Sequence, residues 1–239
     1  PQESQRISQP VPPAVPPAVP PVEPRIEIYS DVVCPWCWIA KRHLERALPI
    51  LAARGLALTP HWHPFQLHPD LPAEGVERAA WRARRFGSPA EAAAADARVA
   101  EAGHAVGLAF RHDLIRRIPN TLDAHRVLRL AEAEGVQAAV LESFYAGYFT
   151  EGADLGEPAI LATLAIRGGL AEAAVTSLLA GEEGRAEVAG EDAAVRRAGL
   201  EGVPAFTMGP YLLFSGAVPA DTMVEAFAKA WQTISRQKP

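Results

Sequence analysis

The chain has 239 residues, of which 49% are hydrophobic and 21% charged, and its formal net charge is −5 at pH 7. This composition supplies enough apolar residues for a sizeable core and excludes a generally disordered chain. No basic run stands out, which disfavours nucleic acid and anionic membranes as main partners, and no apolar stretch approaches the roughly 18 residues of a membrane span.

The first 24 residues differ from the rest because they hold nine of the 22 prolines in a PPAV rhythm. Proline has no amide hydrogen and a fixed φ, so residues 1–24 are predicted to form a disordered, solvated polyproline II tail. A plain tether is favoured over a docking motif for an aromatic groove.

A strand, a helix and a second strand are predicted next. Alternating apolar and polar residues in RIEIYSDVV indicate a short strand that starts at Arg25. The following segment, IAKRHLERALPILAARG, places apolar residues along one helical stripe, which predicts a helix that ends near Gly55. A second strand is predicted over about Ala57 to His63.

The stretch from about Glu74 to Leu200 is predicted to be almost wholly helical. Ala-rich amphipathic segments alternate there with glycine and proline, which indicates about six or seven helices. Ser88 and Asn120 are candidate N-caps.

Strand signals return at the end of the chain. PAFTM and YLLF flank Gly209 and Pro210, which predicts a hairpin, and a last helix follows with Pro219 near its start. Without the helical block the order is strand, helix, strand, then strand, strand, helix. This order predicts an α/β fold with a thioredoxin-like mixed sheet (25–73 and 201–239) and a large all-helical insertion (74–200).

The chain has two cysteines, Cys34 and Cys37, in the sequence CPWC directly after the first strand. One tight loop cannot hold a disulfide-stapled scaffold together, so the pair indicates redox chemistry or half of a metal site. Pro35 suits the first helical position, which places Cys34 at the N-cap, where the helix dipole favours the thiolate. We expect Cys34 to attack a substrate sulfur and the more buried Cys37 to resolve the mixed disulfide.

Two other interpretations of this pair stay open. The cysteines could be inert core residues, or they could bind zinc together with histidines, since zinc sites take four ligands. The candidate histidines are His43, His61 and His63. Within CPWC, Trp36 is expected to be partly exposed and to contact substrate, whereas Trp38 is expected in the core.

A second element supports redox chemistry. GVPAF places Pro204 at the start of a predicted strand, where its missing donor is tolerated and the Val203–Pro204 bond can be cis. An ordinary edge-strand proline is the alternative.

Five separated segments together resemble the FrnE-like branch of the DsbA family of thiol–disulfide oxidoreductases, from about Arg25 to Trp231. They are SDVVCPWCWIAKRHLERAL, WHPFQLHPDLPAEG, NTLDAHRVLRLAEAEG, YFTEGADL and GVPAFTMGPYLLFSGA. The resemblance implies a thioredoxin fold with a helical insertion, a redox-active CxxC, and a cis-proline at Pro204 that faces it and exposes the backbone of Val203 to substrate.

The resemblance also implies that the block around Asn120, Thr121 and His125 caps the active-site side and contributes to substrate binding. Asn120 could equally cap the helix that follows it. His125 is either a hydrogen-bonded surface residue or, if protonated near Cys34, a group that stabilises the thiolate. Asp31 is a candidate to tune the reactivity of Cys34 or to relay a proton to Cys37, or it simply ends a loop.

The expected function is a dithiol–disulfide oxidoreductase or isomerase. The alternative is a glutathione-dependent transferase or isomerase of the kappa-class or 2-hydroxychromene-2-carboxylate isomerase type, for which Cys37 would be superfluous. A non-catalytic binding or chaperone module is a third reading. No resident cofactor is expected, and glutathione is a candidate co-substrate.

The expected partner is a disulfide-containing protein or a small thiol, with neither nucleic acid nor membrane. Both a monomer and a homodimer stay open. The chain start lacks a signal-peptide pattern, and the cysteine pair has no structural role, so the cytoplasm is favoured and the periplasm is the alternative.

Overall fold

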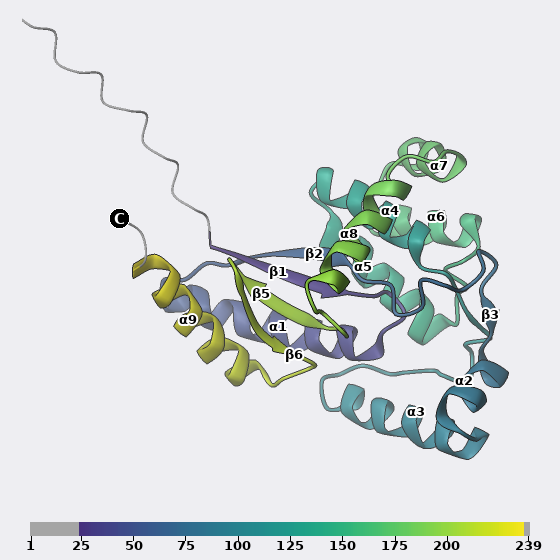
Figure 1. Cartoon of the computed structure of the whole chain (residues 1–239), viewed down its shortest axis with the longest axis horizontal. Coiled ribbons are helices and arrows are strands. Elements are labelled where there is room, and N and C mark those ends of the chain that lie inside the picture. The colour runs from purple at the N-terminus through teal and green to yellow at the C-terminus, as the bar shows by residue number, and fades with distance from the viewer. Residues whose placement is uncertain (1–23, 237–239) are drawn as a thin grey trace, which may run out of the picture.

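The computed structural model describes residues 24–236, so the predicted proline-rich tail lies outside the described residues except for Pro24 (Figure 1). A four-stranded sheet has the order β2–β1–β5–β6, in which β1 pairs parallel to β2 and antiparallel to β5. Its strands are β1 (Arg25–Ser30), β2 (Thr59–Pro64), β5 (Ala205–Met208) and β6 (Tyr211–Ser215). This mixed sheet confirms the predicted thioredoxin-like core.

The central strand joins the two ends of the chain. Ile28 of β1 lies opposite Trp62 of β2 on one side and opposite Phe206 of β5 on the other. Both Ile28 and Phe206 are fully buried. Strand β2 begins two residues later than the sequence predicts and ends at Pro64.

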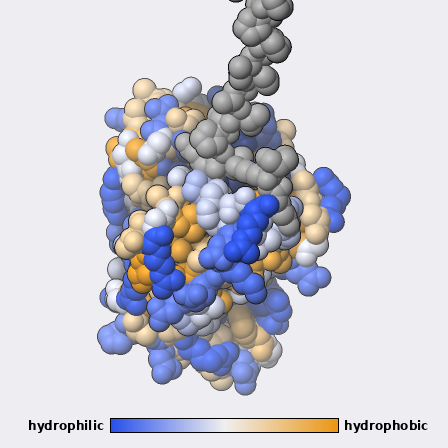
Figure 2. Space-filling model, turned by 90° about the vertical axis from the view of Figure 1, so that its left-hand side faces the viewer, coloured by the Kyte–Doolittle hydropathy of each residue, from blue (hydrophilic) through white to orange (hydrophobic). Residues whose placement is uncertain are grey.

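Helices α1 (Pro35–Ala53) and α9 (Ala220–Arg236) pack against each other beside the sheet (Figure 1). The predicted apolar stripe of α1 is confirmed, because Leu44, Ala47 and Leu51 are fully or almost fully buried. Pro219 directly precedes α9, as predicted. Figure 2 shows that hydrophilic residues separate the apolar ones over the end of the molecule nearest α9.

The insertion between β2 and β5 is largely helical. One prediction needs correction, because the insertion is not entirely helical: β3 (Val76–Glu77) and β4 (Arg117–Ile118) form a two-stranded antiparallel ladder. The helices are α2 (Arg78–Phe86), α3 (Pro89–His104), α4 (Leu122–Ala133), α5 (Gln137–Ala146), the π-helical η1 (Gly147–Glu151), α6 (Pro158–Arg167), α7 (Glu172–Ala180) and α8 (Arg185–Arg197).

The caps of the inserted helices are partly as predicted. Ser88 caps α3, because its hydroxyl accepts a hydrogen bond from the Glu91 amide. The N-cap of α4 is Thr121 rather than Asn120. Asn120 instead accepts the Leu122 amide through its side chain, a turn that places it one residue before the cap.

Aromatic and ionic contacts join the insertion to the CxxC helix. The buried indole of Trp38 on α1 stacks on Tyr145 and Phe149 of the insertion. Its Nε1 donates to Glu142 on α5, and Lys41 of α1 pairs with the same carboxylate at 2.7 Å.

On the other side of the insertion, α4 and α8 contact β2. The boundaries proposed at residues 73/74 and 200/201 both lie in loops. No helix within residues 24–236 has the length and hydropathy needed to cross a membrane.

Candidate active site

The CPWC segment forms the junction between the sheet and α1. Cys34 is the N-cap of α1 with extended backbone angles, and Pro35 occupies the first turn, as predicted. The Cys34 amide donates to the Asp31 carbonyl at 3.1 Å, which closes the turn that follows β1. The proline suits this position because an amide in the first turn has no partner inside the helix.

The two cysteines are both free and have different surroundings. Cys34 is 3% exposed and lines a cavity, whereas Cys37 is 0% exposed and does not line it. Burial raises the pKa of Cys37 well above its usual range, and the hydrogen bond to Cys34 and the charges of Cys34 and Asp31 raise it further. Cys34 is therefore the sulfur that lines the cavity, and Cys37 is the more deeply buried thiol behind it.

The Val203–Pro204 peptide bond is cis, as the sequence predicts. The Cys34 thiol donates to the Val203 carbonyl at 3.6 Å, so the loop before β5 lies against the N-terminus of α1. The Gly216 amide donates to the Pro204 carbonyl at 2.7 Å and closes the base of the β5–β6 hairpin. Pairing between β1 and β5 thus brings the predicted cis-proline loop to Cys34.

Asp31 and His125 form a buried pair behind this junction. His125 Nε2 lies 3.1 Å from Asp31 Oδ1, and the Leu67 amide donates to Asp31 Oδ2 at 2.7 Å. The alternative of a surface histidine is wrong, because His125 is buried. His125 reaches Asp31, and no hydrogen bond or ion pair joins it to Cys34 within the described residues.

Asn120 and Thr121 do not line the cavity that Cys34 lines. The Asn120 side chain accepts from Gln66 Nε2 at 3.2 Å and donates to the Leu71 carbonyl at 2.8 Å, so it joins the loop after β2 to the start of α4. Thr121 is buried at the N-cap of α4. Neither residue lines the cavity beside Cys34, and neither does His125.

The two tryptophans of the CPWC region have the predicted placements. Trp36 is 40% exposed and lines the cavity, whereas Trp38 is buried in the aromatic cluster.

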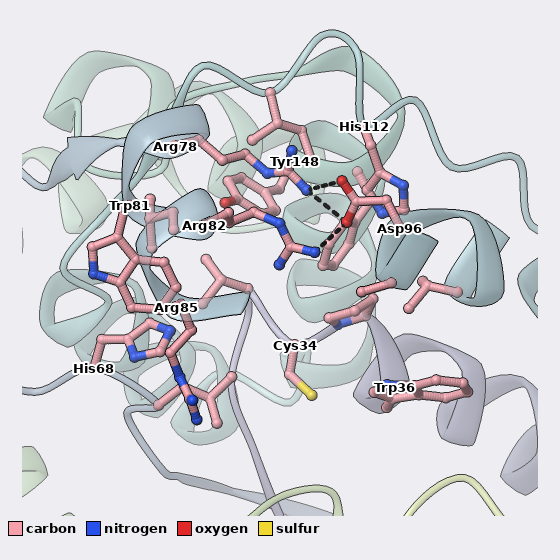
Figure 3. Close-up of a pocket in the computed structure, with 18 of the residues that line it drawn as sticks. Cys34, Trp36, His68, Arg78, Trp81, Arg82, Arg85, Asp96, His112 and Tyr148 are labelled. Carbon is pink, nitrogen blue, oxygen red and sulfur yellow. Dashed lines mark hydrogen bonds and ion pairs between the residues drawn. The ribbon is translucent and has the colours of Figure 1, made fainter. Parts of the chain in front are cut away.

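A cavity of about 500 Å³ opens beside Cys34, between the start of α1 and the α2–α3 hairpin (Figure 3). Its lining includes four arginines that the sequence analysis did not single out: Arg78, Arg82, Arg85 and Arg98. Asp96 on α3 pairs with Arg78 at 2.8 Å and with Arg82 at 2.5 Å. The signal was present in RAAWRARRF, where arginines recur at helical spacing.

Two of the three histidines considered as zinc ligands, His61 and His63, are paired with carboxylates. His61 lies 3.0 Å from Glu132, and His63 lies between Glu27 at 2.6 Å and Glu191 at 2.5 Å. Within the described part of the chain, no group of three or more His, Cys, Asp or Glu side chains is arranged to hold a metal ion. The geometry therefore favours sulfur chemistry over a zinc site at the cysteine pair.

Comparison with known proteins agrees with this geometry. Residues 25–228 match the model of the DsbA-like thioredoxin domain. The chain belongs to this family. No curated protein matches it. A probable DsbA oxidoreductase from Streptomyces coelicolor is 30% identical with a TM-score of 0.80, over 90% of this chain and 92% of that one.

Two more distant structures share the DsbA-like fold of this chain. A 2-hydroxychromene-2-carboxylate isomerase is 14% identical with a TM-score of 0.62, over 90% of this chain and 100% of that one. The cytosolic disulfide reductase DsbM from Pseudomonas aeruginosa, determined with GSH, is 19% identical with a TM-score of 0.59, over 89% of this chain and 99% of that one. The FrnE-like branch within the family stays a prediction.

Proposed function

We propose that this DsbA-like protein is a dithiol–disulfide oxidoreductase in which Cys34 attacks and Cys37 resolves. The observation that carries the proposal is the asymmetry of the pair. Cys34 caps α1 and lines the cavity, with the cis-proline loop 3.6 Å away at the Val203 carbonyl, while Cys37 is fully buried one turn further on.

In the reductive direction, the Cys34 thiolate attacks one sulfur of a substrate disulfide. The substrate S–S bond breaks, one thiolate leaves, and a mixed disulfide joins Cys34 to the other half. Cys37 then loses its proton and attacks the Cys34 sulfur, which releases the second thiolate. The protein pair is oxidised by two electrons and the substrate is reduced to two thiols. The reverse sequence oxidises a dithiol substrate.

The surroundings suggest roles for the other residues. We propose that Trp36 and the Val203 backbone contact the substrate beside Pro35 and Pro204, because Trp36 and Val203 line the cavity with Cys34. Asp31 is close enough to Cys37 for its charge to raise the pKa of that thiol, and it is the candidate to receive the Cys37 proton. Asn120 and His125 form hydrogen bonds to Gln66 and Asp31, which favours a role in positioning these segments over the substrate contacts predicted for them. The same applies to Thr121, which lies between them as the N-cap of α4.

No resident cofactor is needed, because electrons pass between sulfur atoms. We propose a protein disulfide or a small thiol such as glutathione as substrate, supported by the fold that the chain shares with the GSH-bound disulfide reductase. That neighbour is described as cytosolic, which supports our proposal of a cytoplasmic location over a periplasmic one. Cell fractionation, with the untagged protein detected by an antibody, tests this location.

A redox titration in glutathione buffers tests the proposed function. Tryptophan fluorescence follows the transition and mass spectrometry counts the thiols. We expect a reversible two-electron transition, a stable glutathione adduct on Cys34 in Cys37→Ser, and no adduct in Cys34→Ser, because Cys37 is buried.

A wild-type protein that stops at a stable Cys34 adduct, without pairing to Cys37, would contradict the dithiol cycle. The glutathione-dependent transferase or isomerase would then be the better-supported hypothesis. Unchanged activity of Cys34→Ser would instead support a non-catalytic binding or chaperone module.

A further inference from the structure

The cavity beside Cys34 is lined by unequal numbers of positive and negative side chains. Four arginines line it, and Asp96 is the single acidic residue among the described residues of its lining. Burial lowers the pKa values of the two lining histidines, His68 and His112, and so disfavours their charged forms. The excess positive charge is local, because the chain as a whole carries a net charge of −5.

Helix α2 directs this charge toward the cavity. Arg78, Arg82 and Arg85 recur at intervals of four and three residues, which places them on one face of the helix. Figure 3 shows Arg78 and Arg82 reaching Asp96 on one wall and Arg85 beside His68 on another. Arg98 adds a fourth guanidinium from α3.

The Arg78–Asp96–Arg82 cluster contains two positive side chains and one negative side chain. Burial lowers the pKa of Arg82, and Arg78 lowers it further although Asp96 opposes both. The buried Nε of Arg82 has no hydrogen-bond partner in the described part of the protein. A bound anion would offset this unfavourable environment.

Arg85 and Arg98 are the two arginines that a ligand can engage without breaking an existing pair. Neither forms a hydrogen bond or ion pair with any residue in 24–236, and both are exposed residues that line the cavity. Guanidinium groups bind carboxylates through paired N–H donors.

The remaining walls suit the carbon skeleton of a small molecule. Trp36 lies on one side of Cys34, and Trp81, whose ring lies 4.5 Å from that of His68, lies on the other (Figure 3). A volume of about 500 Å³ is within the range of small-molecule pockets.

The geometry points to a binding site for a disulfide of which one half, the anionic half, is a small thiol compound with carboxylates. Arg85 and Arg98 bind these carboxylates, and a sulfur of the disulfide lies at Cys34. This inference rests on the proposed function and names the substrate class of the same site. The anionic half is either part of a free symmetrical disulfide or joined to a protein cysteine. In both, Cys34 forms a bond to one sulfur, the S–S bond breaks, and Cys37 completes the two-electron oxidation of the pair.

Three small disulfides of similar size and different charge test the inference. The probes are 3,3′-dithiodipropionate (anionic), bis(2-hydroxyethyl) disulfide (neutral) and cystamine (cationic). Each oxidises the reduced protein under single-turnover conditions, and each rate is divided by the rate of the same probe with free dithiothreitol. We expect the normalised anionic rate to exceed the neutral one by about tenfold and to fall with added salt, because the cavity attracts anions.

The double variant Arg85→Gln/Arg98→Gln isolates the two arginines. We expect the anionic rate to fall about tenfold while the neutral rate is unchanged and the cationic rate rises. The matched control is Arg46→Gln/Arg84→Gln, which removes the same charge from exposed positions outside the cavity lining. The control should leave all three rates as in the wild type.

The outcomes separate the two proposals. If the neutral probe oxidises the pair and the double variant loses no preference for the anion, the inference is overturned and the proposed function stands. If no probe oxidises the pair, the proposed function fails as well. If the inference holds, a peptide whose cysteine is joined by a disulfide to 3-mercaptopropionate distinguishes a free symmetrical disulfide from a protein-bound one as the substrate. A faster reaction with this peptide than with the free disulfide assigns the site to protein-bound mixed disulfides.

Discussion

Two parts of the insertion, the α2–α3 hairpin and the bundle around α5, are stabilised by different interactions. Helix α5 buries Val140, Leu141, Phe144 and Tyr145 completely, whereas α2 has no buried residue and is tied to α3 through Asp96. The bundle contacts α1 through stacked aromatic side chains and through ion pairs to Glu142. The hairpin supplies the four arginines that line the cavity, and these side chains can change without repacking the core.

The largest expected difference lies between two phenylalanines of the insertion. Phe144 is 0% exposed in α5 and Phe86 is 40% exposed at the end of α2. We expect Phe144→Ala to lower the free energy of unfolding by about 3–5 kcal/mol, because it leaves a cavity in a packed core. Phe86→Ala should cost about 0.5–1 kcal/mol, including its contact with Arg82. Urea unfolding of the reduced protein measures both, and equal losses would refute the contrast.

A pH-dependent effect is expected at the α8 side of the insertion, where His63 on β2 joins Glu27 and Glu191. Burial lowers the pKa of His63, but hydrogen bonds to Glu191 and Glu27 outweigh this and raise it to about 9. Since the folded pKa exceeds the unfolded value of about 6.5, this stabilisation is complete below pH ~6.5 and is lost as pH rises through ~9. We expect a loss of up to about 3 kcal/mol over this range.

Urea unfolding at several pH values, in a Cys34→Ser/Cys37→Ser background that removes the thiol titrations, measures this loss. His63→Gln should flatten the pH dependence even though it lowers the overall stability. A slope that survives this substitution would assign the effect to another group.

The smallest expected effect concerns the hairpin itself. Asp96→Asn weakens the contacts of two partly buried arginines, so we expect a loss of about 1 kcal/mol and faster amide exchange in α2, with α5 unaffected. Asp113→Asn is the matched control, because the Asp113–Arg111 pair is exposed and surface pairs contribute about 0–1 kcal/mol. Hydrogen exchange followed by mass spectrometry compares the two variants. Equal protection of α2 in both would contradict the claim that Asp96 holds α2 against α3.

Local signals explain why much of the fold was predictable. A strand followed by CPWC, a proline at the first turn of α1 and the Gly209–Pro210 hairpin each have a short-range physical cause. The cis bond at Pro204 was likewise indicated by a proline at the start of a strand.

The rest depended on contacts between distant segments. The β3–β4 ladder has two residues in each strand, too few for a sequence pattern, and it pairs Val76 with Ile118. The arginine spacing on α2 was visible, but which way that face points is decided by the packing of α2 on α3. The burial of His125 follows from its pairing with Asp31, 94 residues away, which no local pattern reports.

The antiparallel pairing of β1 with β5 has a consequence for the order of events during protein synthesis. Glu27 and Thr207, whose strands lie side by side, are 180 residues apart in the chain. A ribosome makes β1, α1 and β2 early, and the insertion can fold next as a largely local unit. The Val203 carbonyl reaches Cys34 only after translation has passed the hairpin, so the nascent chain carries Cys34 well before it carries the loop that lies against it.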